Sequence, residues 1–140
     1  MNVHIFKPEH LFKLSLQESQ RDLLSHLTPE YALSLAKVGP ALSAEHEGQI
    51  LACVGVGYQT PEHGIAWAFI SADAGPHLLR LDRAVRRFFS TIRCRRLEAT
   101  VKKGFTPGCR WLELLGFEHE GPLRGYGPDG SDYVRYARVR

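Results

Sequence analysis

Hydrophobic residues recur at helical intervals most clearly in the middle of the chain. Within residues 77–93, Leu81, Val85, Phe88 and Ile92 are three or four positions apart, and mostly polar residues fill the positions between them. This spacing is typical of an amphipathic helix with one buried face. The same stretch carries several arginines on its other faces, so we expect a helix that is strongly basic outside.

Two helices are expected before this one. Apolar residues recur near helical spacing from Glu9 to Leu27, which predicts the first. Residues 28–39 predict the second, because Thr28 is a typical N-cap and Pro29 suits the first turn. Gly39, followed by a proline, is a typical stop signal.

A short helix near the C-terminal end completes the helical set. It is expected to begin near Thr106, with Pro107 in the first turn. Gly116 follows the last apolar turn, where a helix needs a residue that tolerates positive φ. Phe117 should then return the chain to the core.

The strands are expected from alternating or continuous apolar runs bounded by turn residues. Their positions are a first strand ending at Pro8, then 41–46, 49–58, 65–71, 94–101 and two strands around the Pro-Asp-Gly turn at 128–130. The order β-α-α-β-β-β-α-β-α-β-β has one βαβ crossover in its middle. It predicts a mixed-sheet α/β or α+β layer fold in a single domain, residues 1–140.

Composition narrows the class of protein. Hydrophobic residues are 44% and charged residues 24% of the chain, as in soluble globular proteins. No apolar run has the length of a membrane span, and the N-terminus does not resemble an export signal. Cys53, Cys94 and Cys109 are odd in number and widely spaced, which predicts neither disulfides nor a metal site. We therefore expect a cytoplasmic protein with no membrane partner.

The net charge of +3 is unevenly distributed. Residues 77–110 contain ten Lys or Arg residues against only Asp82 and Glu98. Such a block indicates either a solvated helix face or an anionic partner. A phosphorylated cofactor is favoured over nucleic acid, because no aromatic residue is interleaved among the arginines.

The second half of the chain resembles the GNAT superfamily of acyl-CoA N-acyltransferases. "LEATVKKGFTPGCRWLELLGFEHEGPL" is similar to the family's strand, loop, helix, "LGF" and strand series, and "DGSDYVRYARV" is similar to its last strand. The element order resembles the family over nearly the whole chain. The resemblance implies a GNAT-like mixed β-sheet flanked by helices, acetyl-CoA as cofactor, and transfer of an acetyl group to a small-molecule or protein amine.

The resemblance also implies roles for particular residues. The backbone N–H groups of Ile70, Ser71 and Ala72 would polarise the thioester carbonyl. Water or His77 would act as base. Tyr126 or Tyr133 is our candidate to replace the family's acid for the leaving thiolate, which is missing here. The phosphates would be held around the turn into the central helix, by Gly75, His77, Leu79, Arg80 and Arg83.

Three marks of the family are missing. Leu79, Arg80 and neighbouring residues replace the glycines of the phosphate cradle, and Leu112 replaces the tyrosine before "LGF". "KKGF" replaces the family's frequent asparagine. The alternative is therefore a catalytically degenerate GNAT-fold phage protein, located in the virion or acting in morphogenesis with a structural protein partner. Cys109 is a further candidate, as a nucleophile. Four further candidates for the base are Glu45, His46, Glu47 and His63.

Overall fold

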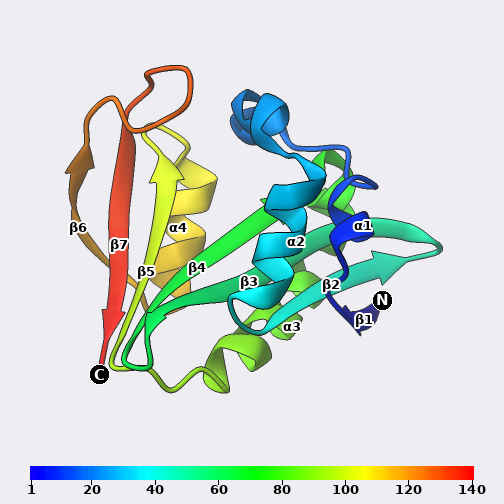
Figure 1. The fold of residues 1–140 in the computed structure, drawn as a ribbon, viewed down its shortest axis with the longest axis horizontal. Coiled ribbons are helices and arrows are strands. Elements are labelled where there is room, and N and C mark those ends of the chain that lie inside the picture. The colour runs from blue at the N-terminus through cyan, green and yellow to red at the C-terminus, as the bar shows by residue number, and fades with distance from the viewer. The chain divides into compact units, whose positions relative to one another are not determined.

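A seven-stranded mixed β-sheet organises the chain, with the strand order β1-β2-β3-β4-β5-β7-β6 (Figure 1). The structure is a computed structural model that describes all 140 residues. The strands are β1 (Asn2–Ile5), β2 (Ala41–His46), β3 (Gln49–Thr60), β4 (His63–Ile70), β5 (Arg96–Lys102), β6 (Glu118–Leu123) and β7 (Tyr133–Val139). The helices are α1 (Pro8–Leu11), α2 (Pro29–Lys37), α3 (Leu78–Ser90) and α4 (Thr106–Leu114), with 3-10 helices η1 (Glu18–His26) and η2 (Ala72–His77).

This order confirms the sequence-based prediction of the fold class. The β4-α3-β5 crossover joins two parallel strands, since His63 pairs with Arg96 and Ile65 with Glu98. The other strand pairs whose register is given are antiparallel. No helix is long and apolar enough to cross a membrane.

The chain divides into two compact units. The first contains Met1–Gly57 and Trp67–Arg93, and the second contains Tyr58–Ala66 and Cys94–Arg140.

In the first unit, α3 buries Leu81, Val85 and Phe89. The sequence analysis assigned Phe88 to this face; Phe88 is only half-buried, and Phe89 takes the buried position. Both residues are aromatic and adjacent, so the periodicity could not separate them. Ile92 is buried as expected, just beyond the end of the helix.

The second expected helix forms almost as predicted. Thr28 caps α2, because its Oγ1 accepts a hydrogen bond from the Tyr31 N–H at 3.1 Å. The helix ends with Val38 as its C-cap in an ordinary right-handed conformation, so Gly39 is not needed for a left-handed turn. Ala32 and Leu35 of α2 belong to the same buried hydrophobic cluster as Ile50 and Cys53 of β3.

The helix expected from Glu9 to Leu27 was wrong in its extent. The chain forms the short α1, then an extended segment, then η1. The Gln17 N–H donates to the Ile70 carbonyl at 2.9 Å, and the Ala72 N–H donates to the Ser15 carbonyl at 2.6 Å. This strand-like pairing with the end of β4 interrupts the helix, because backbone groups that pair with β4 cannot also pair within a helix.

In the second unit, α4 contacts β5 and β6 and ends in the predicted glycine turn. Gly116 has a φ of 94°, the Phe117 N–H donates to the Leu112 carbonyl at 2.9 Å, and the Gly116 N–H donates to the Glu113 carbonyl at 3.0 Å. These two bonds define a Schellman motif. Phe117 is then buried, as the sequence predicted.

Candidate functional site

The turn that follows β4 leads directly into α3. Ser71 opens this turn, and its Oγ accepts a hydrogen bond from the Asp73 N–H at 3.1 Å. His77 is the N-cap of α3, but its side chain makes no capping hydrogen bond and the first turn has no acidic residue. The Leu78 N–H donates to the Gly75 carbonyl of η2, and no acidic side chain in the first turn of α3 neutralises the positive end of its dipole.

The residues predicted to hold a cofactor around this turn are accessible. Leu79 is 80% exposed, and Gly75 and Arg80 are also exposed. A methyl group added to Gly75 would meet no atom within 4 Å. The backbone of the turn can therefore be approached from outside, although Leu79 and Arg80 project side chains where the family has glycines.

The arginines of α3 differ in whether a carboxylate neutralises them. The Arg86 Nε donates a hydrogen bond to Asp82 Oδ2 at 2.7 Å. Arg80 and Arg83 are exposed and have no carboxylate partner. These two guanidinium groups are thus the cations near the helix N-terminus that could bind a phosphate through their side chains.

His77 lies against a second histidine. Its ring centroid is 4.4 Å from that of His46, at an interplanar angle of 43°. His46 Nε2 is also 3.7 Å from Glu47 Oε1. The predicted base therefore belongs to a pair of imidazoles between the end of β2 and the start of α3.

The N–H groups predicted to polarise a thioester carbonyl already have acceptors. The Ile70 N–H donates to Gln20 Oε1 at 2.9 Å and the Ser71 N–H to the Leu51 carbonyl at 2.8 Å. The Ala72 N–H donates to the Ser15 carbonyl. None of the three donors is free, so their predicted role would require Gln20, Leu51 and Ser15 to release them. The sequence contained no signal that residues 15–20 pair with the end of β4, because the partners lie about fifty positions apart.

Tyr126 and Tyr133 lie together in the second unit. Their ring centroids are 5.5 Å apart, with Tyr126 exposed in the loop between β6 and β7 and Tyr133 buried at the start of β7. Either hydroxyl acting as an acid remains a prediction.

A different tyrosine, Tyr136, has the strongly shifted pKa. Its hydroxyl lies 3.5 Å from Glu113 Oε1, and the side chain is buried. Burial, together with the neighbouring Cys109 and Glu113, raises the pKa of Tyr136 to about 12. Tyr136 faces α4, and the i, i+4 spacing of Cys109 and Glu113 on that helix is the signal that could have identified this group.

The parallel pairing of β4 and β5 assembles a charged cluster that the sequence analysis did not identify as a unit. His63 Nε2 lies 3.1 Å from Glu98 Oε1, and the Arg96 Nε donates to the same oxygen at 2.9 Å. Burial raises the pKa of Glu98, but the hydrogen bond and charge of Arg96, with the charges of Arg135 and His63, lower it further, so the net shift is downward. Of these residues, only His63 was among the sequence-based candidates for a base.

The remaining candidates have ordinary surroundings. Glu45 Oε1 is 3.5 Å from His4 Nε2 on the neighbouring strand, and Glu47 is exposed in the hairpin turn. Cys109 is half-buried on α4. Leu112, at the position of the family's acid, is half-buried and has no proton to donate.

Comparison with known proteins finds similarity in structure alone. No family model matches the sequence, and no curated protein sequence matches it. Among solved structures, the chain is similar to Ard1 from Thermoplasma volcanium, with a TM-score of 0.79 and 14% identity over 99% of this chain and 96% of that one.

Two further structures show the same fold. A ribosomal-protein-alanine N-acetyltransferase from Brucella melitensis has a TM-score of 0.68 and 17% identity over 100% of both chains. A GNAT-family acetyltransferase from Streptococcus pneumoniae has a TM-score of 0.64 and 18% identity over 99% of both chains. Neither these two nor Ard1 is described as a phage protein, so the virion or morphogenesis alternative has no support. The chain has the GNAT acyl-CoA N-acyltransferase fold.

Proposed function

We propose that this protein is an acyl-CoA-dependent N-acyltransferase that transfers an acetyl group to an amine. The observation that carries the proposal is the N-terminus of α3, which has no acidic residue in its first turn and is joined to β4 by η2 in a chain with the GNAT fold. A helix N-terminus without an acidic residue in its first turn attracts anions such as the phosphates of coenzyme A.

The phosphates would be held by backbone N–H groups of the first turn of α3 together with the side chains of Arg80 and Arg83. Both arginines are exposed and lack a carboxylate partner, and the backbone around Gly75 is open. In this arrangement, guanidinium groups would bind the pyrophosphate in place of the backbone of a glycine cradle. All three cysteines are free, which fits the cytoplasmic location that we also propose.

When bound, acetyl-CoA supplies the acetyl group, whose bond to sulfur is replaced by a bond to the nitrogen of the acceptor amine. The N–H groups of Ile70, Ser71 and Ala72 donate to Gln20, Leu51 and Ser15, so in this arrangement they do not polarise the thioester carbonyl. The acceptor class is a small-molecule or protein amine. One of the neighbours is named for the alanine of a ribosomal protein, which favours neither class for this chain.

The proposal is tested by release of the coenzyme A thiol from acetyl-CoA in the presence of a panel of amines, including a peptide with a free N-terminus. Thiol release above the rate without amine is expected, and Arg80→Gln with Arg83→Gln should reduce it by raising KM. Arg110→Gln with Arg124→Gln, two exposed arginines of the second unit, is the control of equal charge change. An absence of amine-dependent release for the whole panel would overturn the proposal.

A further inference from the structure

In the second unit, α4 covers one face of the sheet, and the other face carries charged side chains. Tyr136 of β7 faces α4, because its hydroxyl lies next to Glu113 of that helix. Arg135, its neighbour in sequence, therefore belongs to the other face. In the sheet, Arg135 is opposite Thr100 of β5 and Gly121 of β6.

The two arginines on this face, Arg96 and Arg135, differ in their hydrogen bonds to the neighbouring carboxylates. Both nitrogens Nη1 and Nη2 of Arg96 donate to Glu120, and the Arg96 Nε donates to Glu98. The closest acidic oxygen to the Arg135 Nε is Glu98 Oε2 at 3.9 Å, beyond hydrogen-bond distance. The Arg135 Nε is buried without a hydrogen-bond partner, although the side chain as a whole is 37% exposed. Arg135 is thus the cation of this cluster whose hydrogen-bonding capacity is left unused.

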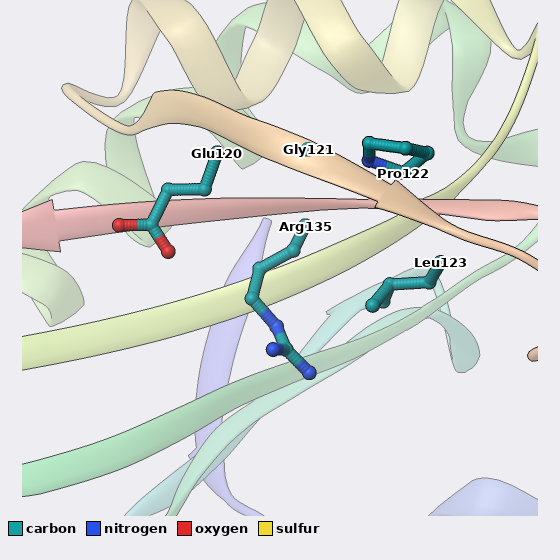
Figure 2. Close-up of a pocket in the computed structure, with 5 residues that line it drawn as sticks. All are labelled: Glu120, Gly121, Pro122, Leu123 and Arg135. Atoms are coloured by element: carbon teal, nitrogen blue, oxygen red, sulfur yellow. The ribbon is translucent and has the colours of Figure 1, made fainter.

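A pocket of about 160 Å³ opens beside this guanidinium. Figure 2 shows the Arg135 side chain extending away from β6, with Glu120 on one side of it and Leu123 on the other. A bulge in β6, where the register shifts between His119 and Gly121, adds Glu120 as an extra residue. Gly121 has a φ of 151°, which a residue with a side chain rarely adopts, so the bulge depends on glycine.

The lining of the pocket determines which ligand it suits. Arg135 is ion-paired with Glu98 but makes no hydrogen bond to it, and a guanidinium with unused N–H donors can bind a planar carboxylate through two parallel hydrogen bonds. A multiply charged phosphate is disfavoured, because the Glu120 and Glu98 carboxylates lie in the same cluster. Leu123 adds an apolar side chain on the face of Arg135, and Pro122 lines the pocket from the other side of β6. The volume corresponds to about five waters, so the bound group is small.

We propose that this pocket binds the carboxylate of a small amine-bearing molecule with an aliphatic side chain, an amino acid, at Arg135. This inference rests on the proposed function only in naming that molecule as the acyl acceptor. Carboxylate binding itself needs neither acetyl-CoA nor turnover, so it can be measured separately.

The binding experiment compares three probes of one carbon skeleton by NMR titration of the 15N-labelled protein, following the arginine side-chain Nε–H resonances. The probes are L-leucine, 4-methylpentanoate, which lacks the amine, and isopentylamine, which lacks the carboxylate. The first two should shift the Arg135 resonance in a saturable way, and isopentylamine should not. Equal shifts with isopentylamine, or no shift with either carboxylate, would overturn the proposal.

Variants locate the binding. Arg135→Gln should weaken binding of 4-methylpentanoate at least ten-fold, and Arg135→Lys, which keeps the charge but not the planar fork, should weaken it by a smaller factor. Arg124→Gln, in the exposed loop after β6, is the control and should bind as the unchanged protein does. Unchanged affinity in both Arg135 variants, with melting temperatures showing that they are folded, would contradict the assignment.

A turnover comparison separates this inference from the proposed function. If acetyl-CoA is used and L-leucine is acetylated with a kcat/KM at least ten-fold above that of isopentylamine, Arg135 recognises the acceptor. If isopentylamine is acetylated equally well, the acceptor assignment is overturned while the acyltransferase function stands. If leucine binds at Arg135 and no amine is acetylated, the carboxylate site stands and the acyltransferase function fails.

Discussion

Gln20 occupies the edge of β4 at Ile70 with its side-chain amide. Gln20 Oε1 accepts a hydrogen bond from the Ile70 N–H at 2.9 Å, and Gln20 Nε2 donates to the Ala68 carbonyl at 2.7 Å. The side-chain amide thereby makes the same pair of bonds with this strand edge that a neighbouring strand would make. A ligand that pairs with the edge at this point must first displace Gln20.

Gln20→Ala should therefore bind acetyl-CoA more tightly if the thioester reaches this edge. One net hydrogen bond contributes about 1 kcal/mol, which corresponds to an affinity gain of about five-fold. The same change should lower the melting temperature by a few degrees, because Ala68 and Ile70 lose their partner. Gln59→Ala, at the exposed end of β3, is the control for loss of a glutamine. Weaker binding by Gln20→Ala would show that Gln20 supports the site and does not compete for it.

The glycine after α4 gives a test of the helix end. Gly116→Ala should lower the free energy of unfolding by about 1 kcal/mol, because alanine is strained at a φ of 94°. Gly75→Ala is the matched control, since Gly75 has no positive φ and an added methyl meets no atom within 4 Å. Denaturant midpoints of the two variants provide the comparison. Equal stability of both would contradict the left-handed role of Gly116.

Close packing around Gly55 predicts a larger effect. A methyl group there would lie 2.5 Å from Trp67 Cζ2 and 2.8 Å from Ala41 Cβ. Gly55→Ala should therefore destabilise the protein by about 1–3 kcal/mol through overpacking. Adding Trp67→Leu should recover part of that loss, because the smaller side chain leaves room for the methyl. A Gly55→Ala variant as stable as the unchanged protein would contradict this packing.

The Glu98 cluster predicts a loss of stability in acid. The folded-state pKa of Glu98 is lowered, so its ionised form stabilises the fold above the unfolded pKa of about 4.3. That contribution is lost as the pH falls through the folded-state pKa. Glu98→Gln should cost about 1–3 kcal/mol at pH 7, and the difference from the unchanged protein should shrink below pH 4.

Melting temperatures measured from pH 7 to pH 3 check this prediction. Glu118→Gln, an exposed carboxyl on β6 without an ion pair, should follow the unchanged protein throughout. A difference between Glu98→Gln and the unchanged protein that stays constant with pH would contradict the ionised role of Glu98.

The parts of the fold that followed from sequence are those set by local chemistry. Thr28 and Gly116 marked helix ends because a cap and a left-handed turn need particular residues. The α3 stripe was predicted because Leu81 and Val85 repeat with the helix. The helix predicted from Glu9 to Leu27 was wrong in its extent, because residues 15–17 pair with a strand end some fifty positions away.

The candidate site was less predictable for the same reason. The turn at Gly75 and the two arginines were found through the resemblance and the charge pattern. The His63–Glu98 contact joins the starts of two parallel strands, and Arg135 comes from a third. Alternation in β7 separates Arg135 and Tyr136 onto two faces, but only the position of α4 shows that Tyr136 lies on the helix side and Arg135 on the other.

Calorimetric titration of the protein with acetyl-CoA, with a melting-temperature scan alongside, tests the proposed function most directly. The account predicts saturable binding that raises the melting temperature, and weaker, more salt-sensitive binding for Arg80→Gln with Arg83→Gln. No binding and no rise in the melting temperature at millimolar acetyl-CoA would contradict it, and would mean that the GNAT fold persists without its cofactor site.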